Sequence, residues 1–80
     1  MKITIETKFN IGDEVYAIDH YYELYPRKKP CVITDIFLYG SAGHPIVRYE
    51  VVCDGNVEVF PESWLFTTYE ECTKWCKKNN

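Results

Sequence analysis

The 80-residue chain has no long run of apolar residues. A membrane-spanning helix needs about 18 or more consecutive apolar residues, and no stretch of the chain approaches that length. The opening residues, MKITIE, also lack the apolar segment of a secretory signal peptide. We therefore expect no membrane partner and a cytoplasmic location.

The sequence is also poor in positive charge and in catalytic groups. Its formal net charge of -3 disfavours binding to nucleic-acid phosphates, because that mode needs a basic field. The two histidines, His20 and His44, lie in predicted loops, and neither belongs to a nucleophile motif. No glycine-rich phosphate loop is visible, and the carboxylate pairs at 13–14 and 70–71 fit a turn and a helix start. The sequence therefore predicts a non-enzymatic protein without a cofactor.

Apolar and aromatic side chains, by contrast, are abundant. The chain is 46% hydrophobic and 16% aromatic, which is too apolar for a disordered protein of this charge. A chain of this length can build one core but not two. We predict a single domain over residues 1–80, with a β-rich body at 2–66 and a C-terminal helix at 67–78.

The body contains five segments with the alternation or the β-branched and aromatic content of strands. The expected strands span residues 2–7, 14–18, 31–39, 46–53 and 56–60. Within the third, Thr34-Asp35 predicts a β-bulge. Residues 40–45 predict a chain reversal, and Asp54-Gly55 predicts a tight hairpin. A short helical turn is expected within 61–66.

The C-terminal segment has the signals of a helix. Thr67 and Glu70 fit a capping box, and lysines near the end suit the negative end of the helix dipole. Tyr69, Cys72 and Cys76 share one stripe, flanked by Trp75. Because so short a helix is marginal in water, we expect it to be docked with Trp75 at least partly buried.

The corner Phe9–Val15, FNIGDEV, organises the body. Gly12 can adopt a positive φ and Asp13 can hydrogen-bond the nearby backbone, so a turn is expected between two core side chains. The pattern Phe-x-x-Gly-Asp-x-Val resembles the entry of SH3-like small barrels, including KOW and Tudor members. The resemblance covers residues 9–66 through the segments holding Ile33 and Ile36, Tyr49–Val51 and Val59–Leu65. It implies a mainly β fold: a five- or six-stranded antiparallel SH3-like barrel with one C-terminal α-helix. The expected core is Ile5, Phe9, Val15, Ile33, Ile36, Tyr49, Val51, Val59, Leu65 and Cys72.

Residues 19–30 form the longest segment without periodicity, and a loop of this length in a small domain is usually functional or mobile. Tyrosines there combine contact area with a polar tip, and basic residues lie beside them. Two of the tyrosines could instead pack back on the barrel. Phe37 and Tyr39 extend the same surface if they emerge on the outer face of their strand. The candidate partner-binding residues are Tyr21, Tyr22, Tyr25, Arg27, Lys28, Lys29, Phe37 and Tyr39.

The four cysteines allow two interpretations. Cys72 and Cys76 lie on one helix face, and Cys31 and Cys53 could complete a zinc site. Structural zinc cysteines usually come in closer pairs, however, and each of these residues also serves as a small buried hydrophobe. We expect buried free thiols and no metal, since a reducing cytosol disfavours disulfides.

Because no catalytic motif is visible, the functional prediction is based on the residues expected at the surface. We expect a protein-binding module that uses the Tyr-rich loop. The alternative is a nucleic-acid-binding KOW- or Tudor-like barrel, and a small zinc-binding domain is a second alternative. The short, acidic, Tyr-rich chain is similar in style to small bacterial and bacteriophage proteins, some of which modulate a host protein.

Overall fold

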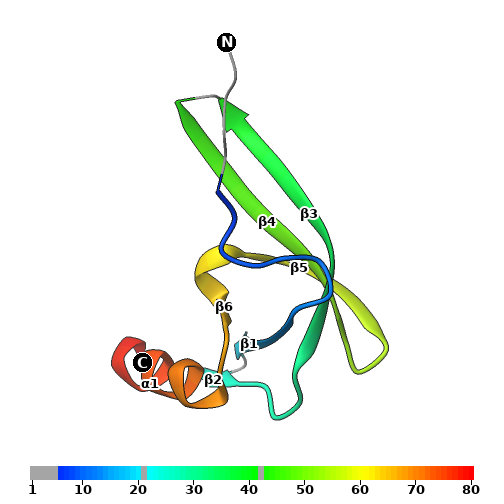
Figure 1. Ribbon diagram of the computed structural model, residues 1–80. Coiled ribbons are helices and arrows are strands. Elements are labelled where there is room, and N and C mark those ends of the chain that lie inside the picture. The colour runs from blue at the N-terminus through cyan, green and yellow to red at the C-terminus, as the bar shows by residue number, and fades with distance from the viewer. Residues whose placement is uncertain (1–5, 21, 42) are drawn as a thin grey trace.

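The computed structural model describes residues 6–20, 22–41 and 43–80. The antiparallel sheet has the strand order β2-β1-β3-β4-β5, and β6 also pairs with β1. The molecule is elongated, 44 × 27 × 19 Å, with the β3–β4 hairpin at one end and the helix at the other (Figure 1). The elements are β1 (Glu14–His20), β2 (Leu24–Pro26), β3 (Cys31–Ser41), β4 (His44–Cys53), β5 (Asn56–Pro61), the 3-10 helix η1 (Glu62–Trp64), β6 (Leu65–Phe66) and α1 (Tyr69–Asn79).

The expectation of a mainly β fold with one C-terminal helix is confirmed. Within the described residues no pairing joins β5 to β1 or β2, so the sheet is open. The strand expected at 2–7 lies mostly outside the described residues, as does the core position Ile5, and residues 6 and 7 belong to no strand.

The larger of two hydrophobic cores, the sheet core, lies on the inner face of the sheet. Tyr49, Val51 and Leu65 are fully buried in it, and Ile36 packs against it from partial burial. The expected core position Val59 is wrong: its side chain is 46% exposed, while the adjacent Phe60 points inward. The buried members are Phe9, Val15, Ala17, Cys31, Ile33, Tyr49, Val51, Cys53, Phe60 and Leu65.

A second cluster, the helix core, lies between α1 and the other side of β1. Cys72 and Cys76 of α1 are buried there with Ile18 of β1. Trp75 is half-buried and its ring centroid lies 6.1 Å from that of Phe66, so the predicted docking of the helix is confirmed. Cys72 is therefore buried as expected, but not in the core that holds the other predicted positions.

The helix begins one residue later than its capping signal suggested. Thr68 is the N-cap, and its Oγ1 accepts a hydrogen bond of 3.2 Å from the backbone N–H of Glu71. Thr68 and Glu71 have the same spacing as Thr67 and Glu70, so the sequence offered two overlapping capping frames. At the other end, the Asn80 side chain exchanges two hydrogen bonds with the backbone of Leu24, at 2.6 and 2.7 Å, and so ties the helix to β2.

The hairpin turn at Asp54-Gly55 and the bulge at Thr34 are present as predicted. Asp54 and Gly55 have φ values of 51° and 82°, as a two-residue type I′ hairpin requires. The register of β3 against β4 shifts between Ile33 and Asp35, which confirms the bulge at Thr34. The prediction of a reversal over all of 40–45 is too broad, because Gly40 and Ser41 belong to β3 and pair with Pro45 and His44 of β4.

The expectation of a loop throughout 19–30 is wrong. β1 continues to His20, and β2 folds back on it with Asp19 opposite Tyr25. Among the described residues, no helix has the length and apolarity needed to cross a membrane.

Candidate protein-binding groove

The pairing of β2 with β1 places Arg27 next to β5, where it contacts Glu58 and Phe60. The backbone N–H of Arg27 donates to the carbonyl of Ala17 at 3.0 Å, which continues the β1–β2 ladder by one residue. Its side chain then crosses toward Glu58 of β5. Two segments that lie 31 residues apart in sequence thus meet at one charged pair.

Arg27 is held on several sides. Its Nη2 donates to Glu58 Oε1 at 2.8 Å, and its Nη1 donates to Glu58 Oε2, in the two-point geometry that suits a guanidinium and a carboxylate. Its Nε lies 3.7 Å from Asp19 Oδ2, and the guanidinium lies 5.4 Å from the ring centroid of Phe60. The hydrogen bonds to Glu58 raise the pKa of Arg27, against a smaller opposing effect of burial. Arg27 therefore serves as a structural link and is not a free recognition charge.

A groove of about 820 Å³ opens around this link. Its walls come from the β1–β2 unit and the turn after it, from the β4–β5 hairpin and from the start of α1. Apolar and aromatic surface is supplied by Tyr25 and Tyr69, which are 41% and 43% exposed. The lining residues are Asp19, Tyr25, Pro26, Arg27, Lys28, Lys29, Cys53, Asp54, Asn56, Glu58 and Tyr69.

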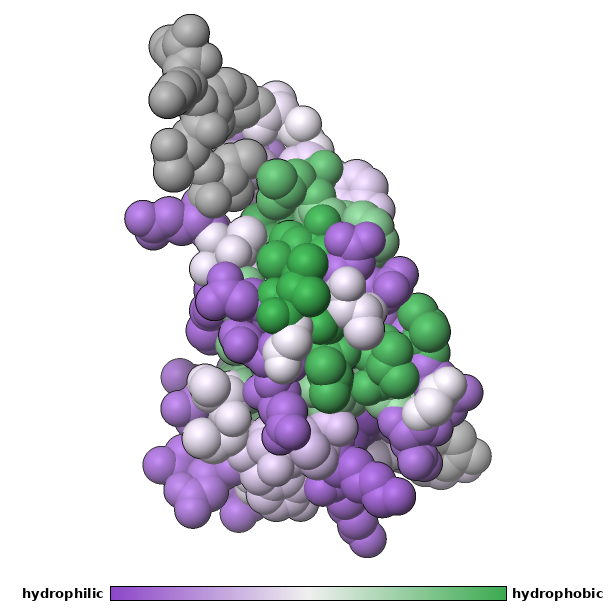
Figure 2. Space-filling view, turned by 45° about the vertical axis from the view of Figure 1, so that its right-hand side comes forward, coloured by the Kyte–Doolittle hydropathy of each residue, from purple (hydrophilic) through white to green (hydrophobic). Residues whose placement is uncertain are grey.

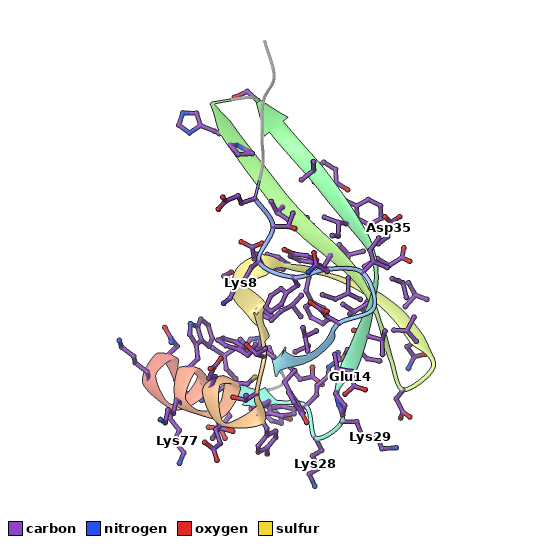
Figure 3. All side chains as sticks on the ribbon, in the orientation of Figure 1. Lys8, Glu14, Lys28, Lys29, Asp35 and Lys77 are labelled. Atoms are coloured by element: carbon purple, nitrogen blue, oxygen red, sulfur yellow. A yellow bond between two sulfur atoms is a disulfide. The ribbon has the colours of Figure 1, made fainter. Side chains whose placement is uncertain are left out.

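The rim of the groove carries both signs of charge. Lys28 and Lys29 project from the turn between β2 and β3 (Figure 3). Lys29 Nζ lies 3.6 Å from Asp54 Oδ1, and both side chains are about three-quarters exposed, at 76% and 77%. An ion pair so exposed adds little stability, so both groups can exchange their partner for a ligand.

The cysteines form two separate pairs. Cys31 and Cys53 are joined by a disulfide across β3 and β4, so the expectation of free thiols is wrong for this pair. Cys72 and Cys76 are free and buried under α1. Burial, and then the neighbouring Cys76, raises the pKa of Cys72 to about 12. In the described part of the chain, no group of three or more histidine, cysteine or acidic side chains is placed to hold a metal ion.

The structure brings only part of the predicted site together. Tyr25, Arg27, Lys28 and Lys29 all line the groove. Tyr22 is 89% exposed and is not among the lining residues, and Tyr21 lies outside the described residues. Phe37 and Tyr39 belong to the β3–β4 hairpin, away from the groove.

Sequence reasoning missed the far wall of the groove. Tyr69 was expected on the buried helix stripe, yet it lines the groove with its ring edge-on to Tyr16 at 5.8 Å. Asp54 was already explained as a residue of the hairpin turn, and nothing in the sequence except its charge distinguished Glu58 as a site residue. Only the fold places these residues opposite Arg27.

Comparisons of the chain with protein-family models, with curated proteins and with solved structures found no match.

Proposed function

We propose that this chain is a non-enzymatic protein-binding module, and that its groove recognises a segment of a protein partner. The observation that carries the proposal is the groove itself. It is lined by the half-exposed Tyr25 and Tyr69, and the Arg27–Glu58 pair holds its walls together. Tyrosine at such positions provides large contact area at low entropic cost. Loops and strand ends held by a rigid sheet are also where binding residues commonly lie.

The charges of the groove favour protein over nucleic acid. Three carboxylates, Asp19, Asp54 and Glu58, line it beside the basic residues. Arg27, which the nucleic-acid alternative would use to hold phosphates, is already committed to Glu58. A phosphate backbone would meet carboxylates on most sides, whereas a polypeptide of mixed charge could pair with both signs.

We extend the proposal to the fold family: the chain is a partly open SH3-like barrel, in which η1 and β6 return the chain to β1. The support is that β6 pairs with β1, with Leu65 opposite Ala17, after the chain has passed through β3, β4 and β5. Action as a bacteriophage-type modulator of a host protein remains part of this proposal. The cytoplasmic location also stays a prediction, and the Cys31–Cys53 bond argues against it, because disulfides persist mainly in oxidising compartments.

The proposal can be tested by affinity capture from a bacterial lysate with matched variants. Tyr25→Ala removes exposed groove surface, while Ile11→Ala removes a large apolar side chain, 63% exposed, at a position outside the groove. We expect a protein retained by the wild type and by Ile11→Ala to be lost by Tyr25→Ala. Titration calorimetry with that protein should show binding weakened by about 30-fold, which corresponds to a hot-spot loss of about 2 kcal/mol.

Two further variants separate the roles of the basic residues. Lys28→Glu should slow association, because an exposed rim charge acts mainly on the rate of encounter. Arg27→Ala should lower the free energy of unfolding as well as affinity, since it leaves the partly buried Glu58 carboxylate unpaired. Equal binding by wild type and Tyr25→Ala would refute the groove. Capture of nucleic acid with a steep dependence of affinity on salt would favour the KOW- or Tudor-like alternative instead.

A further inference from the structure

The outer face of the β3–β4–β5 sheet carries an ordered set of side chains that the groove does not use. The strand register places residues of the three strands in rows across this face. Successive rows lie two residues apart along β4 and β5, as side chains of one face must, and on β3 the bulge at Thr34 adds one residue between Val32 and Asp35. In order toward the β3–β4 turn, the rows are Val32-Val52-Val57, Asp35-Glu50-Val59, Phe37-Arg48-Pro61 and Tyr39-Ile46.

The rows at the two ends of this face are apolar and accessible. Val32 and Val57 are 40% and 63% exposed in the first row, and Tyr39 and Ile46 are 52% and 51% exposed in the last. Val59, which is 46% exposed, connects them. Figure 2, which brings the outer side of the sheet forward, shows a continuous band of hydrophobic surface down its middle.

The two middle rows carry opposite charges. Arg48 lies in one, and Asp35 and Glu50 face each other in the next. Glu50 accepts a hydrogen bond from Thr34 Oγ1 at 2.9 Å, and Asp35 accepts one from the backbone of Ile36 at 2.8 Å. Among the described residues neither carboxylate has an ion-pair partner, and Arg48 has none either. Figure 3 shows Asp35 pointing away from the core.

We propose that this face is a dimer interface, and that its occupant is a second copy of this chain. The pattern is self-complementary. In such a dimer the two sheets stack with a two-fold axis midway between them. The axis runs across the strands and passes over β4 between Arg48 and Glu50, so the rows of the second copy follow in reverse order. Each Arg48 then lies over the partner's Glu50, and each Glu50 lies over the partner's Arg48. The Val32-Val52 end of one sheet covers the Tyr39-Ile46 end of the other, so apolar rows meet apolar rows.

The dimensions suit such a dimer. Strands lie about 4.8 Å apart and same-face residues about 6.8 Å apart along a strand, so the face measures roughly 15 by 25 Å. In projection such a face covers roughly half of the 800 Å² or so that each partner buries in a standard interface, a size that fits a weak, reversible dimer. Stacked sheets lie about 10 Å apart, a gap that an arginine and a glutamate reaching from opposite sides can span. An unrelated partner would not require this match under reversal, and the match is why we assign a second copy.

The first test is the oligomeric state of the full chain, measured by sedimentation equilibrium over a wide concentration series. We expect a reversible monomer–dimer equilibrium. Val59→Lys should weaken it by at least about 100-fold, because it places a charge within the interface. Leu38→Lys is the matched control: Leu38 is 53% exposed, but its cross-strand partner is Val47, which packs toward the sheet core on the other face.

The second test uses charge reversal. Arg48→Glu and Glu50→Arg should each weaken dimerisation strongly, because each homodimer would contain two like-charge contacts. An equal mixture of the two variants should dimerise again, because both contacts of the heterodimer then join opposite charges. Native mass spectrometry can identify that heterodimer, and circular dichroism can confirm that each variant is folded.

Three results would overturn the proposal. One is a wild-type chain that stays monomeric throughout the concentration series, even if the face binds some other protein. Another is a dimer that Val59→Lys leaves intact. The last is a failure of the mixed Arg48→Glu and Glu50→Arg variants to associate, which would exclude the two-fold arrangement. None of these measurements depends on the groove, so they stand apart from the tests of the proposed function.

Discussion

Replacing Tyr49 by Phe removes one oxygen atom from the centre of the sheet core. Tyr49 is fully buried, and its hydroxyl accepts hydrogen bonds from the backbone N–H groups of Lys8 at 3.1 Å and Phe9 at 3.3 Å. The same hydroxyl donates to the carboxylate of Glu62 in η1. One atom therefore joins the segment before β1, the middle of β4 and the turn before β6.

The cost of Tyr49→Phe follows from which groups lose a partner. The N–H of Lys8 keeps a second acceptor, since it also lies 3.1 Å from Glu62 Oε2. The N–H of Phe9 is buried and is left without an acceptor, which costs about 1–3 kcal/mol. The hydrogen bond to the Glu62 carboxylate is also lost, partly offset by the easier burial of a phenyl ring. We expect the free energy of unfolding to fall by about 2–3 kcal/mol.

Urea unfolding measures this loss. With a slope of about 1 kcal/mol per M, the midpoint should fall by about 2–3 M at unchanged slope. Tyr39→Phe is the control, because the same atom is removed from a side chain that is 52% exposed. A Tyr49→Phe midpoint within error of wild type would refute the reasoning.

Alkaline pH provides a second readout of the same side chain. Burial, and then the hydrogen bond to Glu62, raises the pKa of Tyr49. The folded protein therefore holds this proton more tightly than the unfolded chain, in which tyrosine ionises near pH 10, about its ordinary value. The contribution of Tyr49 to stability should be complete below that pH and decline as pH rises above it. The free energy of unfolding of Tyr49→Phe should therefore decline less steeply above about pH 10 than that of the wild type. Identical dependence of stability on pH in the two proteins would contradict the prediction.

Three other predictions concern the cysteines and the helix. Reducing the Cys31–Cys53 bond, which spans 22 residues, should lower the free energy of unfolding by about 3 kcal/mol from loop-closure entropy alone, measured by urea unfolding with and without reductant; equal midpoints would refute a structural role. Trp75→Ala should cost about 2 kcal/mol in the same assay, less than a fully buried tryptophan, and no loss would mean an undocked helix. Because the pKa of Cys72 is about 12, iodoacetamide at pH 8 should modify Cys72 only after unfolding, as judged by mass spectrometry; rapid modification of the native protein would contradict its burial.

The parts of the fold that were predicted correctly depend on local signals. Asp54-Gly55 specified a hairpin because few residue pairs adopt two positive φ values, and the bulge at Thr34 was marked by a polar interruption in an apolar strand. The prediction for Val59 was wrong because β5 carries apolar side chains on both of its faces. Val57 and Val59 share one face and Phe60 lies on the other, so alternation alone could not say which face is buried.

The groove and β2 could not be predicted for a different reason. β2 has no periodicity of its own; it exists because β1 pairs with it and because Asn80, 56 residues away from Leu24, bonds to its backbone. Tyr25 and the basic residues beside it could be selected from the sequence, since such residues are unusual in a connection between strands. Their opposing wall depends on contacts between distant segments, which composition and spacing do not encode.

The position of β1 between the two cores bears on how the molecule comes apart. Val15 and Ala17 belong to the sheet core, while Ile18 belongs to the helix core. A single strand thus serves as the common wall of both, and loosening it exposes both at once. The helix and the sheet should therefore melt as one cooperative unit, and amides of β1 should be among the slowest to exchange with solvent.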